Sequence, residues 1–308
     1  MVALLVSLKL RLMSNSLHRS TSRMVMMLIG GLYALLAIAT GAGAMVALRL
    51  ADASLADDAS VLGFAAVTLG WTLLPLLVFG VDETLDPAVF ALLPVDASRL
   101  MPGLLLAGLI GLPGVATAVV ALSSVLTWSR GGGVAGVVAH MGAALVAAVL
   151  GIATCLLLSR TLTSGFARLL RTRRFRDAAA GLIALLAASA GLTVNAVMSR
   201  AESAGFDQLR GLVHTAAVVA GWTPFGLPWS VPGSLATGQP LLAVVRLLLS
   251  LGVVGALWLG WRRQLDISLC SPIDGGGDGT AVRAGHGVID RLYPPTAAGA
   301  IAGRCLRY

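Results

Sequence analysis

The residues of this chain that could do chemistry are few, and their spacing matches no common catalytic pattern. The chain has no Gly-x-x-x-x-Gly-Lys-[Ser/Thr] phosphate loop, and its only lysine, Lys9, has no glycine near it. His-x-x-x-His pairs and Gly-x-Ser-x-Gly turns are absent too, and Cys155, Cys270 and Cys305 are too scattered for a metal pair or a disulfide framework. The sequence therefore predicts no catalytic residue, no metal site and no cofactor, and it assigns any ATP hydrolysis to another chain.

Two ionisable residues lie inside long apolar runs, and neither run contains an acidic residue. Ionisable groups are costly in lipid and often mark proton relays. We expect His140 to form a hydrogen bond with a neighbouring helix, and Arg246, near the end of its run, to extend its guanidinium toward water. A proton- or sodium-driven carrier is thus disfavoured, and the energy for any uphill transport has to come from a partner.

The elements that position these residues follow from the composition. Hydrophobic residues make up 57% of the 308 residues, charged residues make up 12%, and the mean hydropathy is +0.89. Soluble domains carry roughly 25% charged residues, so the chain is predicted to be an all-α integral membrane protein. The net charge of +8 then indicates contact with the lipid bilayer, and no nucleic acid partner is expected.

Six apolar runs have about the 20 residues that a helix needs to cross a bilayer core of roughly 30 Å. None of them contains Asp or Glu. The predicted transmembrane helices are Met24–Leu48, Val61–Gly80, Leu104–Trp128, Val134–Ser159, Ala178–Val197 and Leu241–Trp261.

The distribution of basic residues orients these helices. With the N-terminus in the cytoplasm, 17 Lys and Arg residues lie on the inner side and 4 on the outer side, while Arg246 lies within a helix. Cytoplasmic segments of membrane proteins are enriched in Lys and Arg. We therefore expect a multi-pass protein of the cell membrane with both termini in the cytoplasm.

Two inner segments have the character of contact surfaces. In Val81–Asp96, Asp86 followed by Pro87 is typical of a helix start, and Pro87–Leu93 predicts a short helix with an apolar face among four acids. Its apolar face favours a partner surface, with the membrane or the protein's own loops as the alternative. The loop 160–177 carries a run of arginines that suits anionic head groups or a cytosolic partner: Arg168, Arg171, Arg173, Arg174 and Arg176.

Segments at the two ends and before the last helix complete the organisation. Within residues 1–23, Val2–Leu12 mixes apolar and basic residues and predicts a helix in the membrane interface, with Lys9 and Arg11 near lipid phosphates. The loop 198–240 predicts a re-entrant or interfacial helix pair at the outer mouth. Its residues suited to the interface are Trp222, Pro224, Phe225, Pro228 and Trp229.

The residues after the last predicted helix, 262–308, form a cytoplasmic tail. A glycine-rich linker covers Ser271–Gly287, and Ile289–Tyr308 then mixes apolar and basic residues again. This weak echo of the N-terminal segment is consistent with the first element of a second repeat.

Three stretches carry a resemblance to a known family. They are Phe79–Pro94 (FGVDETLDPAVFALLP), Gly103–Pro113 (GLLLAGLIGLP) and Trp222–Trp229 (WTPFGLPW). With them, the chain resembles the membrane-spanning permease subunits of actinobacterial ATP-binding-cassette (ABC) exporters.

The resemblance implies an elbow helix at Val2–Leu12, six transmembrane helices and a re-entrant pair at Leu209–Trp229. It also implies an ABC ATPase partner in the cytosol that couples to the first inner loop. The implied coupling residues are Asp82, Glu83, Asp86, Pro87, Val89, Phe90 and Leu93. Related permeases often continue into a second membrane half, so a homodimer or a pair with a separate half is expected. The alternative hypothesis is a membrane scaffold or assembly protein without transport activity.

Overall fold

The computed structural model describes residues 3–4, 6–11, 21–77, 97–130, 133–170 and 206–270, together with the single positions 181, 184, 185, 188 and 195. Every regular element in these ranges is a helix, and they contain no strand. The prediction of an all-helical protein is therefore confirmed. The chain divides into two compact units, Met1–Ser271 and Pro272–Tyr308, and the described residues all belong to the first.

Three helices of the described part are long and apolar enough to cross a membrane. These segments are Met24–Leu50, Val134–Gly165 and Pro240–Ile267. They coincide with the first, fourth and sixth predicted spans. Helix α3 (Ala53–Leu77) contains most of the second predicted span but is not among them, and its first turns carry Asp57 and Asp58.

The third predicted span is not one straight helix. Helix α4 (Ala97–Leu109) and helix α5 (Leu112–Thr127) are bent by 83° where they meet, and as a pair they could form a fourth, broken span. Pro113 starts α5, and a Cβ at Gly114 would lie 2.3 Å from the Leu109 carbonyl oxygen. The sharp bend thus requires the missing side chain of Gly114, which lets the new helix begin directly against the end of the old one.

Two helices extend well beyond the predicted membrane segments. Helix α6 runs from Val134 to Leu170 and helix α10 from Pro240 to Cys270. At 1.5 Å per residue, their 37 and 31 residues span about 55 Å and about 46 Å, more than a bilayer core needs. Arg168 therefore lies on a helix and not in a loop, and the tail predicted from residue 262 begins as helix.

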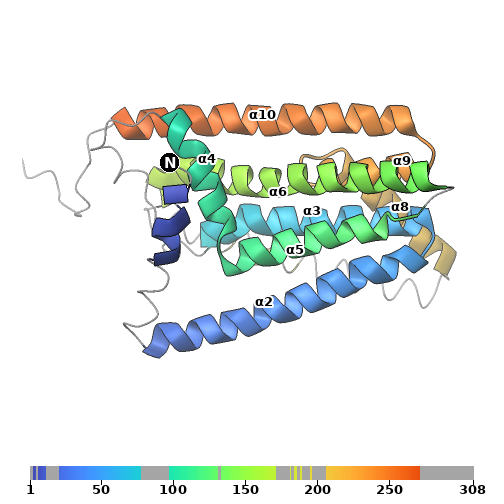
Figure 1. Cartoon of the computed structure of the whole chain (residues 1–308), viewed down its shortest axis with the longest axis horizontal. Coiled ribbons are helices and arrows are strands. Elements are labelled where there is room, and N and C mark those ends of the chain that lie inside the picture. The colour runs from blue at the N-terminus through green and yellow to red at the C-terminus, as the bar shows by residue number, and fades with distance from the viewer. Residues whose placement is uncertain are drawn as a thin grey trace, which may run out of the picture. The chain divides into compact units, whose positions relative to one another are not determined.

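The long helices of this unit pack side by side, as Figure 1 shows for α10, α6, α3, α5 and α2 (Thr21–Ala47), with α4 steeply inclined to them. Helix α2 packs mainly on α5, α10 packs on α6, and α6 also contacts α3 and α5. One buried cluster joins α4, α6 and α10 through Leu100, Leu157 and Trp261. A second joins α2, α3, α5 and α6 to Trp229.

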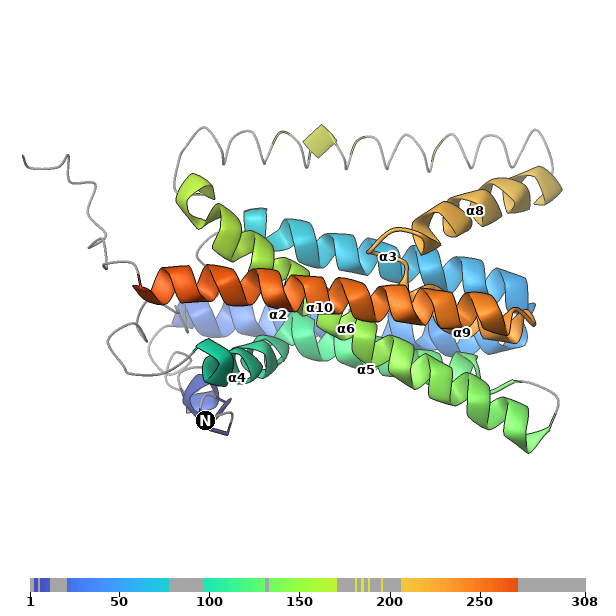
Figure 2. The same ribbon diagram turned by 90° about the horizontal axis from the view of Figure 1, so that it is seen from above.

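The residues directly before α10, 206–239, form a short helical insertion. Helix α8 (Phe206–Gly221), the 3-10 turn η4 (Pro228–Ser230) and helix α9 (Val231–Ala236) precede α10. Figures 1 and 2 both place α8 and α9 near the end of the unit where α10 begins. A helical pair before the last long helix was predicted, although its interior packing was not.

The N-terminal segment is helical at residues 3–4 and 6–11, which agrees with the predicted helix. Lys9, however, has only 4% of its surface exposed, so its predicted contact with lipid phosphates is wrong, while Arg11 is exposed. The predicted span Ala178–Val197, apart from a few single positions, and the tail beyond Cys270 lie outside the described residues.

Candidate functional site

The insertion 206–239 folds back against α3, α6 and α10, and several polar side chains are buried where it packs. The chain leaves α8 through successive turns, in which Thr223 N donates to Ala220 O and Leu227 N donates to Thr223 O. A Cβ at Gly226 would lie 2.3 Å from Ala220 O. Glycine is therefore required for the tight return that brings η4 and α9 against α3, α6 and α10.

The five residues predicted at the outer mouth divide into two groups. Trp222 is half exposed and Pro224 is exposed, which suits an interfacial position, and Phe225 is partly buried. Pro228 and Trp229 are buried within the protein. The turn at Gly226 directs the last two inward, which suits the re-entrant form of the predicted helix pair better than the interfacial form.

Trp229 fills the space between α3 and α6. Its ring stacks on Phe64 with centroids 4.1 Å apart and an interplanar angle of 12°. Its Nε1 donates a hydrogen bond to Thr68 Oγ1 at 3.2 Å, and Cys155 Sγ lies 3.5 Å from the same oxygen. A Cβ at Gly151 on α6 would lie 2.1 Å from the indole ring. The pocket for Trp229 therefore depends on Gly151, and the indole has a polar partner inside it.

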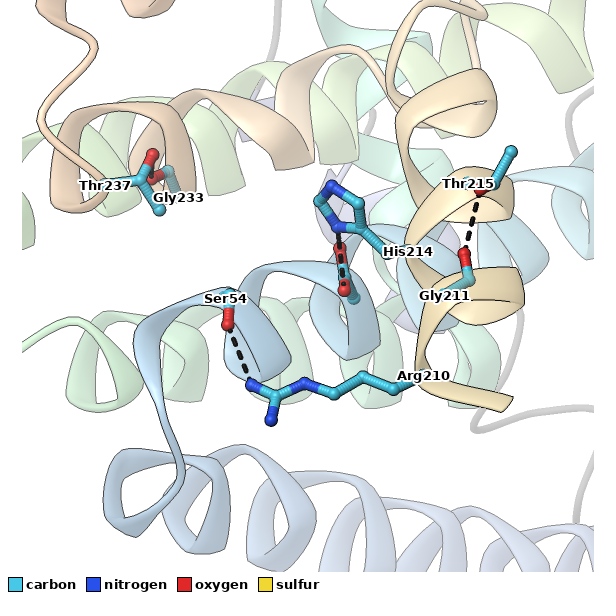
Figure 3. A network of polar contacts seen from close by, with 8 residues as sticks. Ser54, Arg210, Gly211, His214, Thr215, Gly233 and Thr237 are labelled. Carbon is cyan, nitrogen blue, oxygen red and sulfur yellow. Dashed lines mark hydrogen bonds and ion pairs between the residues drawn. The ribbon is translucent and has the colours of Figure 1, made fainter. Parts of the chain in front are cut away.

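A second group of side chains, the acid–arginine cluster, consists of Asp57 and Asp58 on α3, His214 on α8, Ser234 on α9 and Arg246 on α10. His214 Nδ1 donates to Asp58 Oδ1 at 3.0 Å and lies 3.1 Å from Oδ2. The Asp58 side chain is 6% exposed and the His214 side chain 59%. Figure 3 shows His214 and Arg210 on α8, with the Arg210 side chain extending to Ser54, which it contacts at 3.2 Å.

Asp57 lies at the centre of this cluster. Its Oδ1 is shielded from solvent and has no hydrogen-bond partner among the described residues. A Cβ at Gly233 would lie 1.8 Å from that oxygen, so α9 packs directly on the carboxyl group. Burial raises the pKa of Asp57 to about 7, against the opposing effect of the Arg246 charge; the Asp58 charge raises the pKa further and His214 lowers it.

Arg246 is buried, with 6% of its surface exposed, so the prediction that it extends toward water is wrong. One guanidinium nitrogen donates to Ser234 Oγ at 2.6 Å and to Ser230 O at 3.3 Å. The guanidinium also lies 5.4 Å from the centre of the Trp222 ring. All three partners of the guanidinium belong to the insertion. They provide the polar contacts that water was expected to provide to this side chain.

A second polar junction joins the C-terminal ends of α2 and α5. Arg130 donates to the carbonyls of Thr127 at 3.0 Å and Ala51 at 2.6 Å, and also to that of Leu48. His140 Nδ1 lies 2.6 Å from the Arg130 carbonyl oxygen, so Nδ1 carries the proton. The prediction that His140 forms a hydrogen bond is confirmed, but its partner is the backbone of a loop and not another helix.

The other predicted contact residues are not brought into this site. The coupling residues Asp82, Glu83, Asp86, Pro87, Val89, Phe90 and Leu93 lie outside the described residues, as do Arg171, Arg173, Arg174 and Arg176. Arg168 is on the last turns of α6.

Sequence reasoning missed Asp57, Asp58 and His214. The two acids precede the predicted second span, and His214 lies in an apolar stretch too short to cross a membrane. The sequence did contain a sign of the two acids' position. Adjacent acids directly before an apolar run are typical of the first turns of a helix, and here that helix continues as the apolar run. Only the fold shows that Arg246, which has no acid within its own apolar run Leu241–Trp261, has one nearby on α3.

The chemistry of the site is that of binding and packing. Among the described residues, no group of three or more His, Cys, Asp or Glu side chains could hold a metal ion. Asp57 in the acid–arginine cluster can bind or release a proton. The packing of Trp229 between α3 and α6 holds the insertion against these helices. No protein-family model matches this chain, no curated protein matches it, and no solved structure matches it.

Proposed function

We propose that this chain is the membrane-spanning permease subunit of an ATP-driven ABC exporter. A homodimer, or a pair with a second permease half, would enclose the translocation path in the cell membrane. Cytosolic ATPase subunits would supply the energy and move the helices through the inner loop that contains Pro87–Leu93. Both termini would lie in the cytoplasm.

The observation that supports this proposal most is the insertion before the last long helix. Residues 206–236 leave the surface, turn at Gly226 and place Trp229 between α3 and α6. An insertion packed in this way links the N-terminal end of α10 to α3 and α6. A movement of these helices relative to one another would therefore open or close that end.

The absence of a phosphate-loop sequence also favours a division of labour between chains. The sequence has no nucleotide-binding motif, while its apolar helices suit a transport path. A proton-driven carrier was disfavoured because no acid lies in the apolar run of Arg246, but Asp57 on α3 does lie near Arg246. Within the predicted spans Val134–Ser159 and Leu241–Trp261, which the structure describes in full, His140 and Arg246 are the only His, Lys, Arg, Asp or Glu residues. These two helices therefore offer few groups for a proton path across the membrane.

The proposal is tested by co-expression of the full chain with an ABC ATPase encoded beside it, followed by purification in detergent. We expect the two proteins to co-purify and Phe90→Asp to abolish the complex, because a charge would disrupt the apolar face of the predicted coupling helix. Ser98→Asp, which adds the same charge at an exposed position on α4, is the matched control and should leave the complex intact.

The two hypotheses give different results. A wild-type chain that binds no ATPase and moves no substrate in vesicles would favour the scaffold hypothesis. A complex that survives Phe90→Asp would refute the coupling role of Pro87–Leu93 and assign the contact to another inner segment.

A further inference from the structure

Asp57 is partly buried, and one oxygen of its carboxyl group is placed where a negative charge has poor solvation. Its Oδ1 is shielded from solvent, has no hydrogen-bond partner among the described residues, and is covered by the backbone of Gly233. Burial without a donor disfavours the ionised form of a carboxyl group much more than the neutral form. Binding of a proton removes the negative charge and so removes this unfavourable desolvation.

The charged and titratable groups around Asp57 come from three elements. Asp58 on α3 is already paired with His214 on α8. Arg246 on α10 interacts electrostatically with Asp57, but its hydrogen bonds to Ser234 and Ser230 hold it to the insertion. Helix α9, which covers the carboxyl group, has the sequence VPGSLA and contains no titratable side chain. The pair Arg210–Asp52 lies at the exposed edge.

We propose that Asp57 is a proton-binding site whose occupancy controls the packing of the segment 228–237 on the neighbouring helices. With the proton bound, the neutral carboxyl group fits against Gly233, and Arg246 remains bonded to Ser230 and Ser234. When the proton leaves, the carboxylate attracts the Arg246 guanidinium and needs water. Both effects draw Arg246 away from the insertion and loosen α9.

The pH range follows from the burial of the group. Since the pKa of Asp57 is raised from 3.8 to about 7, the folded form binds the proton more tightly than the unfolded form. The stabilisation is therefore complete below pH 3.8 and is lost as the pH rises through about 7. This inference does not depend on the permease proposal.

The test is hydrogen–deuterium exchange of the full chain in detergent, at about pH 6 and about pH 8 on either side of this pKa. Exchange is expressed as protection factors, which removes the intrinsic effect of pH on amide exchange. We expect protection of the segment 228–237 to fall about tenfold at the higher pH, as the linkage relation requires for this shift, while the middle of α6 stays unchanged. In Asp57→Asn, which mimics the protonated form, protection should be equal at the two pH values.

Two matched variants separate Asp57 from its neighbours. Asp52→Asn removes an exposed acid of the same helix end, and His214→Gln removes the histidine; both should keep the pH effect. An infrared band of a protonated carboxyl group that disappears from the wild-type chain above pH 7, and is missing in Asp57→Asn, provides a measurement independent of exchange. The proposal is overturned if wild-type protection does not depend on pH, if the effect survives in Asp57→Asn, or if His214→Gln abolishes it.

Discussion

The backbone of Gly233 lies directly on the carboxyl group of Asp57. A Cβ added at residue 233 would lie 1.8 Å from Oδ1, 2.1 Å from Cγ and 2.7 Å from the Cβ of Asp57. Two residues far apart in the sequence therefore lie so close together that only glycine fits at position 233. The first turns of α3 thus limit where α9 can pack. Two features of the site, the shielded carboxyl oxygen of Asp57 and the position of α9, depend on this contact.

Gly233→Ala should destabilise the protein by about 2 kcal/mol. The new methyl group overlaps the base of the Asp57 side chain and not only its flexible end, so α9 has to move. Denaturant titration in mild detergent, followed by circular dichroism, measures the change. Gly252→Ala on α10, where a Cβ meets no atom within 4 Å, should leave stability unchanged or slightly raised. Equal stability of the two variants would contradict the contact.

Gly151→Ala should expel Trp229 from its pocket. A Cβ at this position would lie 2.1–2.5 Å from indole atoms, and a rigid ring cannot adapt. We expect a loss of about 2–3 kcal/mol in the free energy of unfolding, and increased proteolysis of the insertion. Gly142→Ala on the same helix has open space around its Cβ and serves as the control. A smaller residue at 229 should restore stability to Gly151→Ala, so the double variant Gly151→Ala/Trp229→Leu should lose less than the sum of the single changes.

Trp229→Phe should destabilise the protein by about 1–2 kcal/mol, because it removes the hydrogen bond to Thr68 and part of the buried ring. Trp222→Phe is the natural comparison, since Trp222 is half exposed and contacts Arg246 only through its ring face. Its loss should stay below about 0.5 kcal/mol. Thermal unfolding of the two variants under identical conditions gives the ranking, and the reverse order would show that the buried tryptophan contributes little.

Arg130→Ala should reduce the free energy of unfolding by about 2–3 kcal/mol, because three backbone carbonyls at the ends of α2 and α5 lose a charged donor at once. Arg130→Lys should recover only part of this loss, since one ammonium group cannot match the planar fork of a guanidinium. The neighbouring Arg49 is exposed, so Arg49→Ala should be neutral or slightly stabilising through reduced repulsion of Arg130. Unfolding in detergent distinguishes these cases.

Much of the helix pattern could be predicted from the sequence. The apolar runs at Met24–Leu48, Val134–Ser159 and Leu241–Trp261 all lie within observed helices, because the length of an apolar run directly reflects what a membrane helix needs. The break between α4 and α5 could not be predicted, although Pro113 lies within the predicted span Leu104–Trp128. A proline indicates where a helix starts, whereas the angle of 83° depends on the close approach at Gly114.

The candidate site was much harder to predict. Trp229 and Trp222 belong to one short motif, yet one is buried and the other half exposed. Composition treats them alike, because both are aromatic residues flanked by prolines. Their difference comes from the turn at Gly226 and from the space that Gly151 leaves on α6.

By itself, the sequence determined that the protein is helical, that apolar helices dominate it, and that its basic residues lie mostly in a few segments. These properties are local or compositional, since each depends on one stretch of chain and its preference for lipid or water. Only the tertiary structure decided that Arg246 is buried beside Asp57, with Gly233 against the carboxyl group. Interactions between charges and the fit of one backbone against a side chain depend on distances between segments, and residue order along the chain does not specify those distances.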